Sequence, residues 1–164
     1  MPTESDILAI ADDVVARARA AGADAADAVA VAGTALGVSR RLGKPQSLER
    51  SESTDLGLRV FVGNRQAIAS TSDFAPDSLD EVAARALAMA RSVPDDPFCG
   101  LADPELLAID IAELDIAVAG EPATDTLVDW ARRAEDAALA VDGVTNSEGA
   151  DASWAQTAIA LAAS

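Results

Sequence analysis

The stretch SESTDLGLRVFVGNRQAIASTS, from Ser51 to Ser72, decides the fold of this chain. Apolar residues recur at every second position from Leu56 to Val62, which is typical of a strand with one buried face. Gly63-Asn64 follows as a two-residue turn, and glycine at its first position tolerates the positive φ of a type II′ turn. The resulting register pairs large inward residues with small ones, Leu58 with Ala69 and Val60 with Ala67. The stretch therefore predicts a β-hairpin that a helix can cover.

Two amphipathic helices are predicted on either side of this hairpin. The first spans 3–21, with Thr3 as its N-cap and Asp6 completing a capping box. The second begins at Pro76 and ends before Pro94, with Ser78 and Glu81 in the S-x-x-E form of the same box. The apolar stripes predicted to face inward are Ile7, Ala11, Val14 and Ala18 in the first helix, and Leu79, Val82, Ala86, Met89 and Val93 in the second.

Two further strand signals lie between the first helix and the hairpin. Residues 24–32 form an alanine-rich strand candidate, and 34–52 form a second hairpin candidate that turns at Gly43-Lys44-Pro45. The predicted order is α-β-β-β-β-α. The expected fold class is α+β, an antiparallel β-sheet with helices packed on one face, followed by part of a second α+β domain.

A proline-rich segment suggests the domain boundary. We expect an amino-terminal domain at 1–93, a linker at 94–104 and a second domain from 105 to 164. The second domain contains a helix over 124–142, followed by strands at Val144–Ser147 and Ser153–Leu161. Because the last of these strands is alanine-rich, a helix is the alternative there. The residues predicted to face inward from this helix are Leu127, Trp130, Ala134, Ala137 and Val141, and Trp154 is also expected in the core. Because the last strand ends at once at Ser164, the chain is expected to be cut in mid-domain.

Composition excludes several classes of function. A net charge of −16 repels phosphate backbones, so direct nucleic-acid binding is not expected. No run can span a membrane and no signal peptide is present, which favours a cytoplasmic protein. The chain has no histidine and one cysteine, Cys99, so histidine-based nucleophile systems and the common zinc sites are ruled out. No catalytic residue, metal ligand or cofactor is therefore assigned to this chain.

The block from Gly37 to Asp110, beginning GVSRRLGKPQSLERSESTDLGLRVFVGN, resembles the first domain of the TldD/PmbA family. The segment SEGADASW, Ser147 to Trp154, resembles the next element of that family. The similarity covers nearly the whole chain and is greater to the PmbA (TldE) type of subunit than to the TldD type. In the family, these segments are only the beginning of a chain two to three times longer.

The resemblance implies a cytoplasmic metallopeptidase complex that processes peptides. In the family, TldD-type subunits carry zinc on an H-E-x-x-x-H helix, and PmbA-type subunits lack that motif and pair with TldD. The family is also described as a modulator of DNA gyrase and has been linked to maturation of peptide antibiotics. Because this chain has no histidine, no zinc ligand carries over. Zinc is implied only on a TldD-like partner, and the expected partners are that subunit and the peptide substrate.

Basic residues cluster in the sheet region and provide the candidate binding site. The stretch from 40 to 65 contains six basic residues and only three acidic ones, although the whole chain is acidic. Arg40, Arg41 and Lys44 are the predicted contacts to a partner subunit or peptide. The alternative is that they are solvent-facing charges that protect strand edges.

Two classes of function remain open. One is the non-catalytic amino-terminal region of a PmbA-like subunit. The other is a stand-alone acidic adaptor that binds another protein and has no role in proteolysis. The reading frame after Ser164 separates them, because only the first predicts a much longer chain.

Overall fold

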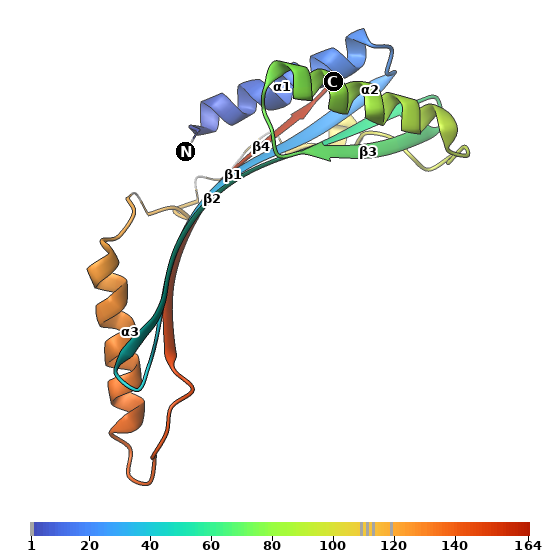
Figure 1. The fold of residues 1–164 in the computed structure, drawn as a ribbon. Coiled ribbons are helices and arrows are strands. Elements are labelled where there is room, and N and C mark those ends of the chain that lie inside the picture. The colour runs from blue at the N-terminus through green and yellow to red at the C-terminus, as the bar shows by residue number, and fades with distance from the viewer. Residues whose placement is uncertain (1, 109, 111, 113, 119) are drawn as a thin grey trace. The chain divides into compact units, whose positions relative to one another are not determined.

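The computed structural model describes residues 2–108, 110, 112, 114–118 and 120–164, and its architecture is α+β (Figure 1). The elements in chain order are α1 (Glu4–Ala20), β1 (Ala25–Arg41), β2 (Lys44–Val62), β3 (Arg65–Thr71), α2 (Pro76–Ser92), the 3-10 turn η1 (Pro104–Leu106), α3 (Thr124–Leu139) and β4 (Ala150–Ala163). The strands form one antiparallel sheet in the order β3-β2-β1-β4, with helices packed against it. The predicted fold class is therefore confirmed.

The chain forms two compact units, and neither is continuous in sequence. Unit 1 consists of residues 1–32, 53–113 and 157–164, and unit 2 consists of residues 33–52 and 114–156. Strands β1, β2 and β4 each contribute residues to both units. The sequence-based boundaries at 93 and 105 are placed where the proline-rich segment interrupts the helical pattern. The compact units are instead divided within the long strands. Those domain boundaries remain a prediction.

The hairpin that decides the fold lies in unit 1. Its antiparallel register pairs Leu58 with Ala69 and Val60 with Ala67, which confirms the predicted pairing. Of the two turn residues only Gly63 has a positive φ, of 56°, as a type II′ turn requires. The hairpin thus turns its large apolar residues toward the helices, and small residues on β3 make room for them.

Helices α1 and α2 cover one face of the sheet in unit 1 (Figure 1). Helix α1 begins with the predicted capping box, in which the Asp6 amide donates to Thr3 Oγ1 at 3.2 Å and the Thr3 amide donates to Asp6 Oδ2 at 2.8 Å. All four inward residues predicted for this helix are buried. The sheet contributes the buried residues Ala26, Ala28, Ala30, Ala32, Leu56, Leu58, Val60, Ala67, Ala69, Ala158, Ala160 and Ala162.

The predicted cap of α2 is wrong. The N-cap is Ala75, and its side chain makes no capping hydrogen bond. Asp73 organises this turn instead, since its carboxylate accepts from the Ala75 amide at 2.9 Å and from Ser78 Oγ at 2.7 Å. The Ser78 hydroxyl therefore binds Asp73 and does not form the predicted capping box with Glu81. Of the predicted apolar stripe, Leu79, Val82 and Ala86 are buried, whereas Met89 is exposed.

Strands β1 and β2 are longer than the sequence suggested. The strand predicted at 24–32 and the first arm of the hairpin predicted at 34–52 are one continuous strand. The turn lies at Leu42-Gly43, one residue before the predicted Gly43-Lys44-Pro45. Both turn residues have positive φ, 48° and 77°, which is the type I′ geometry of a tight hairpin. The structure therefore has three strands between α1 and α2, one fewer than predicted.

Unit 2 has its own small core, formed where α3 packs on β1 and β4. Its buried members are Leu36, Val38, Leu127 and Ala131, and Ala150, Ala152 and Trp154 pack against them. The inward face predicted for α3 is wrong except at Leu127, because Trp130 is 50% exposed and Val141 is also exposed. The buried positions instead recur every four residues, at Leu127, Ala131 and Glu135.

Limited proteolysis should cut the chain first between Val93 and Glu105. This segment lacks regular structure as far as η1 and displays Phe98 to solvent, where chymotrypsin can reach it. Most apolar residues of the hairpin, by contrast, are buried in a sheet, and every residue from Leu56 to Val62 is in regular strand. Brief digestion followed by mass spectrometry identifies the first cut. Early cleavage within 54–72 while this segment stays intact would contradict the prediction.

Candidate functional site

The predicted site residues Arg40, Arg41 and Lys44 lie at the β1–β2 turn of unit 2, beside a buried carboxylate. Glu135 of α3 is 1% exposed. It accepts hydrogen bonds from the Leu42 amide at 2.6 Å, from the Gly43 amide at 3.0 Å and from Arg40 Nε at 3.1 Å. We call Arg40, Leu42, Gly43 and Glu135 the turn cluster. Helix α3 thereby holds the tip of the hairpin through a single side chain.

The turn cluster fixes the charge state of Glu135. The hydrogen bond from the Gly43 amide, assisted by those from Leu42, Arg40 and Ser147, holds the pKa of Glu135 below its ordinary value, although burial acts in the opposite direction. Glu135 is therefore an anion at neutral pH. Leu42 is in the left-handed region that non-glycine residues disfavour, and its amide donates to this anion. The carboxylate thus stabilises a strained turn.

The three predicted basic residues differ in their surroundings. The side chain of Arg40 is only 15% exposed, and its charge is paired with Glu135. Arg41 is exposed and donates from Nε to the Ser147 carbonyl at 2.9 Å. Lys44 is exposed. Arg41 and Lys44 are therefore available to a partner, whereas Arg40 has a structural role in the turn cluster.

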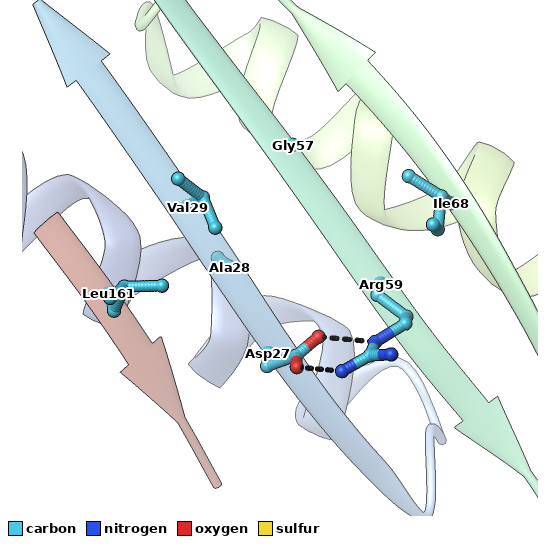
Figure 2. A pocket seen from close by; sticks show the side chains of 7 residues that line it. All are labelled: Asp27, Ala28, Val29, Gly57, Arg59, Ile68 and Leu161. Carbon is cyan, nitrogen blue, oxygen red and sulfur yellow. Dashed lines mark hydrogen bonds and ion pairs between the residues drawn. The ribbon is translucent and has the colours of Figure 1, made fainter. Parts of the chain in front are cut away.

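A second candidate site lies in unit 1, on the face of the sheet opposite α1 and α2, which we call the open face. A cavity of about 220 Å³ lies on it, the open-face pocket, and Figure 2 shows the side chains that line it. The lining residues are Asp27, Ala28, Val29, Gly57, Arg59, Ile68 and Leu161. The apolar members are well exposed, Ile68 at 62% and Leu161 at 71%. These exposed aliphatic side chains form the apolar rim of the pocket.

One ion pair forms the polar wall of the open-face pocket. Arg59 donates from Nε to Asp27 Oδ1 at 2.9 Å, and its second nitrogen contacts the other carboxylate oxygen (Figure 2). The Arg59 guanidinium also lies over the Phe61 ring, 5.1 Å from its centroid. The hydrogen bond to Asp27 is the main cause that raises the pKa of Arg59. The pocket is therefore apolar and carries no net charge, which suits an uncharged side chain.

The residues of this chain do not fit a zinc site. Zinc in proteins is bound by three or four side chains, mostly cysteine and histidine. The whole sequence has no histidine and a single cysteine. Across the residues that the structure describes, no three potential metal ligands come together.

The sequence analysis missed the open-face pocket, although a signal was present. The outward positions of β3 and β4 carry Ile68, Ile159 and Leu161, whereas a face in water usually carries polar side chains. Alternation along one strand identifies only its buried face. A search for strands that are apolar in both phases would have pointed to this surface. In the described part of the chain, no helix combines the length and apolar character needed to cross a bilayer.

Comparison with known proteins gives consistent results. Residues 26–90 match the model of PmbA/TldA metallopeptidase domain 1. The metalloprotease PmbA of Escherichia coli O157:H7 is 37% identical over 127 residues, which is 77% of this chain and 28% of that protein. A metalloprotease PmbA homolog of Haemophilus influenzae is 36% identical over 131 residues, 79% of this chain and 29% of that protein. The chain thus spans less than a third of the length of these relatives.

Solved structures share the fold. A putative modulator of DNA gyrase from Bacteroides thetaiotaomicron superposes with a TM-score of 0.76 at 19% identity, covering 100% of this chain and 40% of that one. TldE from Thermococcus kodakarensis superposes with a TM-score of 0.68 at 15% identity, covering 92% of this chain and 34% of that one.

Proposed function

This chain belongs to the PmbA/TldD metallopeptidase family, and we propose that it is the non-catalytic amino-terminal region of a PmbA-type subunit. In this proposal it works in a cytoplasmic complex with a TldD-type subunit that carries the zinc and cleaves peptides. In this complex the chain provides structural support and a surface for binding the partner, and the partner subunit catalyses peptide cleavage.

The observation that carries the proposal is a PmbA-like sequence without a zinc ligand set. Identities of 36–37% to PmbA metalloproteases extend over more than three quarters of the chain. Over the same residues there is no histidine. Zinc ligands for peptide hydrolysis therefore come from outside these 164 residues. Zinc bound in a peptidase polarises the carbonyl and activates water, and no residue here is assigned to either role.

The surface that we propose for the partner is the exposed basic pair next to the turn cluster, Arg41 and Lys44. A chain with a net charge of −16 has few places that attract an acidic surface, and this pair is one of them. Charges at the rim of an interface mainly alter the association rate and its salt dependence. The proposed contact should therefore be stronger at low ionic strength.

Charge reversal tests this assignment. We expect Lys44→Glu and Arg41→Glu each to weaken binding of a TldD-type subunit from the same genome roughly two- to fivefold at low salt. The effect should shrink at high salt, because the Debye length falls to about 3 Å at 1 M. Binding is measured by capture of the co-expressed subunit at the two salt concentrations. Peptidase activity and zinc content of the chain alone, both expected at background, are recorded on the same samples.

The matched control is Arg133→Glu, an equal charge change on an exposed position of α3. It should leave binding unchanged. Arg40 is left out of the comparison, because reversing it would place a second anion beside Glu135 and disturb the turn cluster. Binding that is indifferent to both reversals would remove Arg41 and Lys44 from the contact. A chain that pairs with no TldD-type subunit would instead favour the adaptor alternative.

A further inference from the structure

Unit 2 contains a cavity of its own, which we call the hairpin pocket. It has a volume of about 260 Å³, and its wall comes from the end of β1, the β1–β2 turn, the start of β2 and helix α3. Pockets for drug-sized ligands usually measure about 300–1,000 Å³. The hairpin pocket is therefore suited to a smaller group, such as a compact acid or a single terminal residue.

Much of the wall of the hairpin pocket is apolar. The hairpin contributes Val38, Pro45 and Leu48, and α3 contributes Val128 and Ala131. Leu48 is 59% exposed and Val128 is 41% exposed, so this part of the wall is in contact with water in the isolated chain. A ligand that covers both side chains removes apolar surface from water, which is favourable. The body of the ligand should therefore be aliphatic.

The polar part of the wall is a guanidinium with unused donors. The turn cluster uses Arg40 through Nε alone, which donates to Glu135. Among the described residues, Nη1 and Nη2 of Arg40 have no hydrogen-bond partner, and no side-chain nitrogen is both fully buried and unpaired, so solvent reaches both atoms. A Cβ atom built on Gly43, which also lines the pocket, would lie 3.9 Å from Nη2. The free edge of the guanidinium is thus next to the pocket wall, and such an edge binds a carboxylate through two parallel hydrogen bonds.

The charges around the hairpin pocket favour an anion. None of its described lining residues is acidic, and the carboxylate of Glu135 is already engaged by the turn. Arg41 and Lys44 are exposed on the same turn and make it locally positive in a chain with a net charge of −16. The Ser39 and Ser47 hydroxyls, which also belong to the wall, are bonded to each other at 2.7 Å. Because that bond uses one hydroxyl hydrogen, the other remains available to a ligand.

We propose that the hairpin pocket binds a carboxylate carried on a compact aliphatic group. The carboxylate pairs with Nη1 and Nη2 of Arg40, a serine hydroxyl is the second donor, and the aliphatic group covers Leu48 and Val128. A free branched-chain acid and the carboxyl-terminal residue of a polypeptide both present this chemistry. The site binds its ligand without making or breaking a covalent bond. The proposal does not rest on the proposed function, because no partner subunit takes part.

The test is a titration of the isotope-labelled chain with isocaproate, followed by two-dimensional amide NMR spectra. We expect saturable shifts confined to the hairpin tip and α3, among them the amides of Gly43 and Ala131. Isocaproamide has the same body without the charge, and acetate has the charge without the body. Each should bind roughly tenfold more weakly or less. N-acetyl-alanyl-alanyl-leucine and its carboxyl-terminal amide separate the two sources, because shifts of the same amides by the free-acid peptide alone assign the site to a polypeptide terminus. Shifts by isocaproate without the peptide assign it to a small acid.

Three substitutions in the wall should weaken isocaproate binding. Arg40→Lys keeps a positive charge for Glu135 but removes the planar pair of terminal nitrogens, and should raise the dissociation constant roughly fivefold or more. Leu48→Ala and Val128→Ala each remove part of the apolar wall, and should raise it roughly three- to tenfold. Raising the salt should weaken binding in the parent chain, since it screens the ion pair with the ligand.

The matched controls make the same substitutions at exposed positions of unit 2 that do not line the pocket. They are Arg133→Lys and Val141→Ala, and both should bind isocaproate like the parent chain. Circular dichroism should show every variant folded. The proposal would be overturned if neither isocaproate nor the peptide gave saturable shifts, or if the shifts lay outside the hairpin tip and α3. Equal binding of isocaproate and isocaproamide, or binding unchanged by Arg40→Lys and by both wall truncations, would also overturn it.

Discussion

Val60→Asp is expected to unfold unit 1. Val60 is fully buried and faces the core under α1 and α2. A carboxylate introduced there has no partner, and an uncompensated buried charge costs about 3–5 kcal/mol. The whole stability of a domain is only about 5–15 kcal/mol. Thermal unfolding followed by circular dichroism should therefore show a melting transition that is shifted far downward or lost at 25 °C.

The matched control introduces the same charge on the other face of the hairpin. Ile68 is exposed on the open face, so Ile68→Asp leaves its carboxylate in water. Arg59→Ala removes one half of a partly exposed ion pair, and such pairs contribute about 1 kcal/mol or less. Both variants should melt close to the parent chain. Equal losses in Val60→Asp and Ile68→Asp would mean that both faces of the sheet are buried in solution.

Glu135→Ala is expected to destabilise unit 2 strongly. The substitution leaves the Leu42 and Gly43 amides without their acceptor and Arg40 without its counter-charge. Hydrogen bonds to a charged acceptor in such a partly buried site contribute about 1.5–3 kcal/mol. We expect the melting temperature to fall by on the order of 10 °C. Asp136→Ala, one residue further along α3 but exposed, is the control and should change it little.

The same carboxylate gives a pH dependence with a definite sign. The pKa of Glu135 in the folded chain lies below its ordinary value of 4.5. Its contribution to stability is therefore fully present above about pH 4.5 and is lost as the pH falls through the folded pKa. Melting curves of the parent and Glu135→Gln chains should differ most at neutral pH and converge on acidification. Curves that stay parallel down to pH 2 would show that Glu135 does not stabilise the fold as an anion.

Local pattern was sufficient to predict the β2–β3 hairpin and helix α1 of unit 1. The register of the β2–β3 hairpin follows from a two-residue turn and an alternating strand, both of which are local properties. The same is true of α1, whose cap and buried stripe lie within a few residues of each other. The resemblance identified from the block beginning at Gly37 overlaps the matched family domain at 26–90. The fold class and the family could therefore both be predicted from the sequence.

The structure of unit 2 was harder to predict from the sequence, because its core depends on contacts between residues that are distant in the sequence. A glutamate on an amphipathic helix is assigned to the solvent face, yet Glu135 is buried by the turn at Leu42, more than ninety residues earlier. The predicted inward face of α3 therefore passed through Trp130, which is half exposed, and left out Glu135. The extension of β1 was missed for a related reason, since Gly33 and Thr34 look like a break until neighbouring strands pair with them. The open-face pocket likewise involves all four strands and could not follow from any one of them.

The pairing of β1 with β4, which are far apart in the sequence, has a consequence for biosynthesis. The Ala26 amide donates to Ser164 Oγ at 3.0 Å, and the Ser164 amide donates to the Ala26 carbonyl at 3.0 Å. These partners are separated by 138 residues, which a ribosome adds in roughly seven to thirty seconds. During that interval β1 lacks β4, its neighbour on one side, whereas β2 and β3 can already pair with each other. Nascent β1 is therefore the segment most open to mispairing with other chains, and a chaperone that shields it would act before β4 emerges.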